Sequence, residues 1–186
     1  MPDVPQAGAL RDRFEAMYEA NYHRVLGYAM RRMSRDDAAD VVAETFLVAW
    51  RRLAEVPDGE EARLWLFGTA RRVLANQQRA GRRGIRLSER IRNELVQEVQ
   101  PTSADSDMNL AAAALARLPS EQREVLTLVA WEGLDAGEIA QVCGCSRNAA
   151  RIRIHRARRR FVRELNRLGG SVKQNPVGGH VSKAYE

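Results

Sequence analysis

The segment 134–168 constrains the fold more than any other part of the chain, because it places two helix signals around one glycine. In "LDAGEIAQVCGCSRNAA", Asp135 can cap a helix, with Glu138 three residues later as its capping-box partner. Gly144 can adopt the positive φ that a tight turn requires, and Ser146 is a favourable N-cap for a second helix. The sequence therefore predicts a helix-turn-helix.

On a helical wheel, the second of these helices separates an apolar stripe from an arginine-rich face. The apolar stripe consists of Ala150, Ile154, Ala157, Phe161, Leu165 and Leu168. The residues predicted to face DNA are Ser146, Arg147, Asn148, Arg151, Ile152, Arg153, His155, Arg156 and Arg159. An outward Ile152 suits a thymine methyl group, and arginine suits base edges and phosphates. The alternative, a solvated basic helix in an ordinary bundle, leaves the agreement of cap, turn, stripe and charge unexplained.

Composition supports a polyanionic partner. The 186 residues carry a net charge of +6, and almost all the cations are arginine. The two cysteines, Cys143 and Cys145, are too close for a disulfide framework and lack further zinc ligands, so we expect reduced, buried thiols and no metal or cofactor. No apolar run is long enough to cross a bilayer and the N-terminus is no signal peptide, which predicts a soluble intracellular protein without membrane insertion.

Apolar residues recur at helical spacing and no strand pattern is convincing, which predicts an all-α fold of two small helical domains joined by a linker. We expect an N-terminal domain over 10–79 and a linker over 80–107, which contains glycine, proline and short polar residues. The C-terminal domain with the helix-turn-helix is expected over 108–168. The Gly-rich tail, 169–186, is predicted to be disordered.

In the first domain, a helix is predicted over 35–53, capped by Ser34. Its core stripe contains Val42 and Phe46. The residues predicted to face outward are Asp40, Val41, Glu44, Leu47, Val48 and Arg51. Acids mixed with exposed aliphatic residues fit an interface for a basic partner, and a second packing face within a three-helix bundle fits equally well.

A further helix is predicted over 62–79. The candidate residues for binding single-stranded DNA on it are Trp65, Thr69, Arg71, Arg72, Asn76 and Arg79. An aromatic ring can stack on a base while arginines hold phosphates and an amide reads a base edge. For Trp65 alone, a place in the core is slightly favoured over stacking. The preceding loop "AEVPDGEEAR" could hold an extruded base.

With these segments in order, the chain resembles the extracytoplasmic-function (ECF) sigma factors of the sigma-70 family. The resemblance is carried by "DDAADVVAETFLVAWRR", "WLFGTARRVLANQQR", "LPSEQREVLTLVAWEGLDAGEIAQVCGCS" and "ARIRIHRARRR", and it covers about 10–168. It implies an alternative sigma factor that binds core RNA polymerase, reads the −35 and −10 promoter elements and helps to open the promoter. It also implies a cytoplasmic protein, on the nucleoid when in holoenzyme, with an anti-sigma factor as a further partner.

The resemblance assigns a role to each face. The face with Asp40 and Glu44 matches the segment that docks on the clamp helices of the largest polymerase subunit. The helix with Trp65 matches the segment (sigma region 2) that captures the −10 strand, and the helix-turn-helix (region 4) matches the −35 reader. Arg72 departs from the amide frequent in the family, so Arg72, Asn76 and the preceding loop all remain candidates for base capture.

Three other functions account for parts of the sequence. A stand-alone helix-turn-helix regulator would bind duplex DNA tightly without polymerase. An adaptor that titrates a partner would need the acidic face but not the arginine face. An enzyme is disfavoured because the sequence shows no nucleophile constellation and no phosphate-binding glycine loop.

Overall fold

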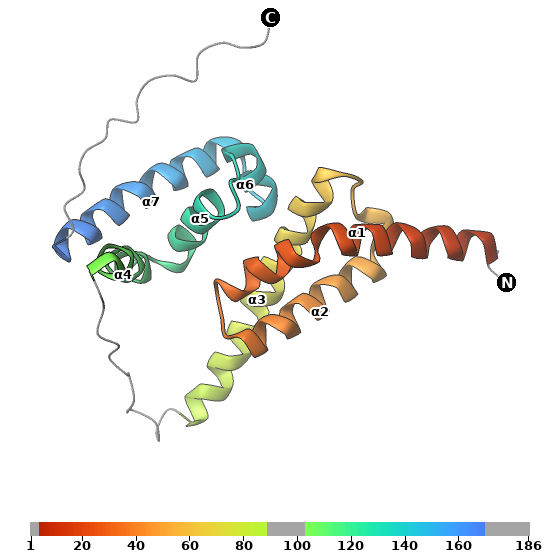
Figure 1. Cartoon of the computed structure of the whole chain (residues 1–186), viewed down its shortest axis with the longest axis horizontal. Helices are drawn as coiled ribbons and strands as arrows, with labels where there is room; N and C mark the ends of the chain where they lie inside the picture. Colours follow the sequence, from red (N-terminus) through yellow and green to blue (C-terminus); the bar gives the residue numbers. More distant parts are fainter. Residues whose placement is uncertain (1–3, 89–102, 170–186) are drawn as a thin grey trace, which may run out of the picture. The chain divides into compact units, whose positions relative to one another are not determined.

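The computed structural model describes residues 4–88 and 103–169, and all regular structure in these ranges is helical (Figure 1). This confirms the predicted all-α fold. The elements are α1 (Val4–Met30), α2 (Arg35–Arg51), the 3-10 helix η1 (Leu53–Glu55), α3 (Glu60–Ser88), α4 (Ser103–Ala116), α5 (Ser120–Ala130), α6 (Ala136–Cys143) and α7 (Arg147–Arg167). Residues 89–102 of the predicted linker and the tail from residue 170 onward lie outside the described residues.

The chain divides into two compact units. One contains Met1–Gln97 and Leu128–Ile152, and the other contains Glu98–Thr127 and Arg153–Glu186. In the first unit α1, α2 and α3 pack on one another, and α6 packs on α3. Tyr28 of α1 and Phe67 of α3 are almost fully buried and stack with ring centroids 5.1 Å apart. These large side chains form the centre of the core of the first unit.

Helix α2 begins as the sequence predicts, because the Ser34 hydroxyl accepts a hydrogen bond from the Asp37 amide at 3.3 Å. It contacts both α1 and α3, so it buries a wider arc than a single stripe. Val41 and Thr45 are fully buried together with Val42 and Phe46. The prediction that Val41 faces outward is therefore wrong, because a single core stripe describes a helix with one packing neighbour, whereas α2 has two.

The helix-turn-helix forms with the predicted local signals. The Asp135 carboxylate accepts from the Glu138 amide at 2.9 Å, and the Glu138 carboxylate accepts from the Asp135 amide at 2.8 Å. Gly144 ends α6 in the left-handed region, with φ 62° and ψ 45°. Ser146 accepts from the Ala149 amide at 3.2 Å at the start of α7. Each reversal of the chain here is thus set by neighbouring residues.

Gly68 marks the place where α6 approaches α3 within the first unit. A Cβ atom at Gly68 would lie 3.4 Å from the Val142 carbonyl oxygen, at van der Waals contact, so the α6 backbone lies directly beside α3 here. Beside this contact, Arg63 Nη2 lies 3.1 Å from Glu138 Oε1. The capping glutamate of α6 therefore also forms an ion pair with α3.

Helix α3 is longer than predicted. The glycines at 81 and 84 predict an end at residue 79, yet the helix continues to Ser88. A glycine inside a helix costs only about 1 kcal/mol relative to alanine, and no proline interrupts this stretch. Two isolated glycines are therefore compatible with a continuous helix.

Candidate nucleic-acid interface

One side of α7 presents the side chains that were predicted to face DNA. Ser146, Arg147, Asn148, Arg151, Ile152, Arg153, His155, Arg156 and Arg159 are all exposed. Ile152 is 43% exposed although it is aliphatic. Ala150 and Ala157 on the opposite stripe are fully buried. The helix therefore offers cations, an amide and one apolar side chain on its open side, a combination suited to the major groove.

Asp135 links the turn electrostatically to this helix. Its carboxylate lies 4.0 Å from Arg147 Nη2. Backbone hydrogen bonds from Glu138 and Gly137, together with the nearby Arg147 and Arg151, hold the pKa of Asp135 below its ordinary value. The cap therefore stays ionised at neutral pH.

The exposed side of α2 carries most of the predicted docking residues. Asp40, Glu44 and Arg51 are exposed, Leu47 is 40% exposed, and Val48 is half-buried. Val41 lies in the core and does not belong to this surface. Trp50 is 46% exposed and extends the same side of the helix. Its signal in the sequence was a large aromatic residue three positions after Leu47.

Helix α3 orders its predicted DNA-binding side chains by hydrogen bonds to its own turns. Arg72 is exposed and donates to the Gly68 carbonyl at 3.1 Å and to the Thr69 hydroxyl at 3.3 Å. Arg79 is exposed and donates to Asn76 Oδ1 at 2.8 Å. Asn76 is exposed as well. These polar groups are therefore accessible and partly fixed in direction.

Two members of the predicted set lie differently. Thr69 is only 3% exposed and its hydroxyl accepts a hydrogen bond from Arg72, so the expectation that Thr69 contacts DNA is wrong. Trp65 is half-buried, which lies between the two alternatives of a core residue and an exposed stacking platform. The Arg52 guanidinium lies 5.9 Å from its ring centroid.

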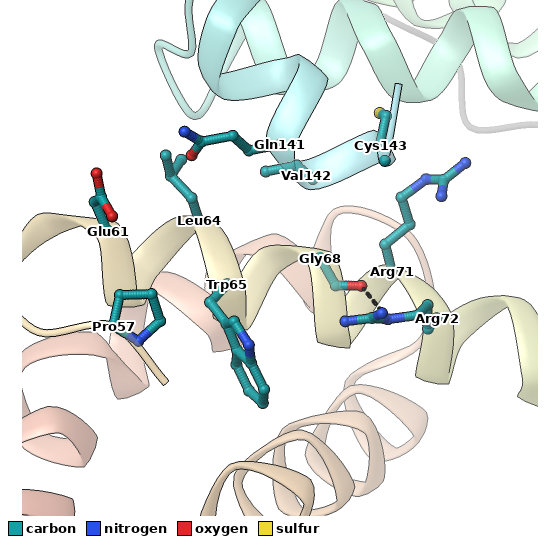
Figure 2. A pocket seen from close by; sticks show the side chains of 11 residues that line it. Pro57, Glu61, Leu64, Trp65, Gly68, Arg71, Arg72, Gln141, Val142 and Cys143 are labelled. Carbon is teal, nitrogen blue, oxygen red and sulfur yellow. Dashed lines mark hydrogen bonds between the residues drawn. The ribbon is translucent and has the colours of Figure 1, made fainter. Parts of the chain in front are cut away.

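A hollow of about 380 Å³ lies along α3 (Figure 2). Its walls are Pro57, Glu61, Leu64, Trp65, Gly68, Arg71, Arg72, Gln141, Val142, Cys143 and Gly144. In Figure 2 the Trp65 indole and the Arg72 side chain lie on one side of α3, whereas Arg71 extends toward Cys143 on the other. The loop before α3 contributes Pro57 to this hollow, so it lies beside the aromatic ring that could stack on a base.

Within the part of the chain that the structure describes, no group of three or more histidine, cysteine, aspartate or glutamate side chains is placed to hold a metal ion. The helices traced over 4–88 and 103–169 also include none that is long and apolar enough to cross a membrane.

Two sigma-factor family models match the chain. The model for sigma-70 region 2 covers residues 17–84, and the model for sigma-70 region 4 covers residues 108–161. The chain is 30% identical over 159 residues to the ECF RNA polymerase sigma factor SigL of Mycobacterium tuberculosis, covering 83% of this chain and 89% of SigL. It is 30% identical over 123 residues to EcfG of Rhodopseudomonas palustris, covering 66% of this chain and 68% of EcfG.

Among solved structures, the sigma factor RpoE of Bartonella quintana, in complex with the anti-sigma factor NepR, is similar with a TM-score of 0.64 and 26% identity. The match covers 82% of this chain and 96% of that one. The chain therefore belongs to the sigma-70 family, within its group of ECF sigma factors. It is an alternative sigma factor that directs RNA polymerase, which confirms the resemblance found in the sequence.

Proposed function

We propose that this sigma factor works by binding and strand capture through three separate surfaces, with no catalysis of its own. The observation that carries the proposal is the open side of α7, where Asn148, Ile152 and Arg156 are exposed on the second helix of a capped helix-turn-helix. Such a helix supplies duplex readout in the major groove. We assign it to the −35 element.

The second surface is the exposed side of α2. Asp40 and Glu44 supply negative charge, and Leu47 and Trp50 supply exposed apolar surface on the same helix. A basic helical partner with apolar side chains is complementary to this surface. We therefore assign it to the clamp helices of the largest subunit of core RNA polymerase.

The third surface is α3 with the loop before it. Trp65 offers a partly open ring, while Arg72, Asn76 and Arg79 offer accessible polar groups. Stacking and phosphate contacts there would offset the few kcal/mol that unstacking a base costs. We assign this surface to the non-template strand of the −10 element, with Arg72, Asn76 and the loop as the base-capturing candidates.

In this scheme region 2 corresponds to 10–79 and region 4 to 108–168, with 80–107 connecting them. We further propose that an anti-sigma factor holds the protein inactive, since RpoE of Bartonella quintana is similar and was solved with the anti-sigma factor NepR. The protein would act in the cytoplasm, on the nucleoid when bound to polymerase.

The test is run-off transcription. Purified protein is added to sigma-free bacterial core polymerase on fragmented genomic DNA, and the 5′ ends of the transcripts are sequenced. Discrete starts that share upstream −35 and −10 sequences are expected. Tight duplex binding by the protein alone, without core-dependent transcription, would favour a stand-alone helix-turn-helix regulator instead.

A further inference from the structure

Arg13 of α1 is bonded to the loop that joins α2 to α3 at three points. Its Nη1 donates to the Leu53 carbonyl at 2.9 Å, and its Nη2 donates to the Val56 carbonyl at 2.6 Å. Its Nε donates to Asp58 Oδ1 at 2.9 Å. The Arg13 side chain is 34% exposed, whereas that of Asp58 is 86% exposed. One side chain from a distant part of the sequence therefore contacts the beginning, middle and end of this loop.

The loop is also held by the ion pair between Arg52 and Glu55 and by the buried side chains of Leu53 and Val56. Its internal backbone bonds are the short ones of the 3-10 turn, from the Glu55 amide to Arg52 and from the Val56 amide to Leu53. Such turns have poorer hydrogen-bond geometry than an α-helix. Gly59 then takes a φ of 66° before α3 begins. The guanidinium of Arg13 satisfies two loop carbonyls that lie past the end of α2.

Only arginine fits this position. Its planar fork offers five N–H donors at fixed directions, so it can serve two carbonyls and one carboxylate together. Lysine keeps the charge but concentrates its three donors on one nitrogen. A lysine at this position would therefore preserve the local electrostatics while releasing part of the loop.

The loop in turn sets one wall of the hollow along α3. Val56 is 3% exposed and anchors the loop in the core, and Pro57 lines the hollow together with Trp65. Pro57 stands between Val56 and Asp58, both of which Arg13 holds. The position of Pro57 relative to Trp65 therefore depends on Arg13.

We propose that Arg13 is a positioning residue for −10 recognition, which fixes the loop 53–59 so that an unpaired base is held between Pro57 and Trp65. Arg13 does not contact the base; it acts through the loop. The inference rests on the proposed function of α3 in strand capture.

The experiment compares holoenzymes assembled with the wild-type protein, Arg13→Lys and Arg13→Ala. The probe is a fork-junction DNA that carries the −10 element found by run-off mapping. A second set of probes replaces each −10 base in turn, and the affinity of each holoenzyme is measured for every probe. Misplacing a binding wall by a small distance is expected to lower the affinity ratio between the native and the substituted base roughly tenfold at one position. Affinity for core and discrimination at −35 should stay at the wild-type values.

Arg11→Ala is the matched control. Arg11 lies on the same helix two residues earlier, and its side chain is 74% exposed and pairs with Glu15 of α1 at 2.8 Å. Its removal should leave −10 discrimination unchanged. Thermal melts of every variant guard against unfolding, and Arg13→Lys keeps the test valid where Arg13→Ala fails to fold.

An unchanged −10 ratio in folded Arg13→Lys would overturn the inference, as would an equal loss of affinity at every −10 base. Loss of core binding in parallel would also overturn it. A wild-type holoenzyme without any −10 discrimination would overturn the proposed function of α3 and this inference with it. Loss at one position in the Arg13 variants, with normal core affinity, would support both.

Discussion

The rings of Phe14 in α1 and Trp50 in α2 meet edge to face, with centroids 5.0 Å apart and planes at 78°. This contact fixes the indole on the helix surface while 46% of Trp50 stays exposed. A rigid, partly open tryptophan loses little conformational entropy on binding, which is why this residue type is frequent at energetic centres of interfaces. Trp50 therefore has the features of an anchor on the α2 surface.

Replacing Trp50 by alanine is expected to weaken binding to core polymerase by roughly 2 kcal/mol, which is the scale of an interface hot spot. The affinity can be measured by competition with a labelled sigma factor for core. Leu10→Ala removes another exposed apolar side chain, on α1, and should have little effect on the affinity. An equal loss in both variants would indicate a general effect of apolar area rather than an anchor.

Reversing the charge of Asp40 and Glu44 together, as Asp40→Arg with Glu44→Arg, is expected to abolish core binding. Both carboxylates are exposed and face the proposed basic partner, so the substitutions place like charges opposite one another. Circular dichroism and thermal melting should remain close to wild type. The control is Glu19→Arg, a charge reversal at an exposed position of α1. Asp36 and Asp37 are unsuitable for this purpose, because they lie in the N-terminal turn of α2. Unchanged core affinity in the double variant would remove the docking assignment.

Arg156→Ala should cost about 1–3 kcal/mol at one promoter position if its guanidinium makes a bidentate base contact. The measurement is holoenzyme affinity for duplexes in which each −35 base pair is changed in turn. Arg163 is exposed further along α7 and provides a comparison expected to weaken all sequences alike. A uniform loss for Arg156→Ala would show that this residue holds phosphate instead.

Val41→Ala should lower the free energy of unfolding by about 1–3 kcal/mol, because it opens a cavity at a fully buried site of α2, the helix that packs on both α1 and α3. Urea denaturation measures this directly. Core affinity of the folded protein should be unchanged. Reduced affinity without a loss of stability would return Val41 to the docking surface.

Asp135→Ala should destabilise the fold at neutral pH, because α6 loses the acceptor for its first free amides. The pKa of Asp135 is lowered in the folded state, so its ionised cap contributes fully above the unfolded value of about 3.9 and is lost as the pH falls through the lower folded pKa. Denaturation of the wild type and Asp135→Ala across this acidic range should therefore show two curves that converge below about pH 4. Asp135→Asn keeps a capping oxygen without a charge, so its stability should not follow the pH dependence of the wild type and should not equal that of Asp135→Ala. A gap independent of pH would show that the charge contributes nothing.

Local signals made the helix-turn-helix predictable from the sequence. Asp135, Gly144 and Ser146 each act on residues within four positions, so their effect is encoded in a short stretch. The all-α fold follows similarly from the repeat of apolar residues. Most of the arginine face on α7 could be placed because one packing stripe fixes the orientation of the helix.

Contacts between distant segments were not predictable in the same way. Val41 and Thr69 were placed outside because a wheel assumes one neighbour, whereas α2 and α3 each pack against more than one helix. The bonds from Arg13 to Leu53 and Val56 bridge some forty positions, and no periodicity in the sequence points to them. Such features need the folded arrangement.

The composition of α7 has a consequence for the ionic conditions under which the protein is stable. The helix holds nine arginines and a single acid, Glu164. Like charges at this density repel one another, and dissolved salt relieves the repulsion within a Debye length of about 8–10 Å. Salt also competes with DNA phosphates for the same guanidinium groups. Added salt therefore stabilises the free helix while it weakens the promoter complex. The free protein screens its arginines with dissolved anions, and a polyanion that binds α7 takes the place of those counterions.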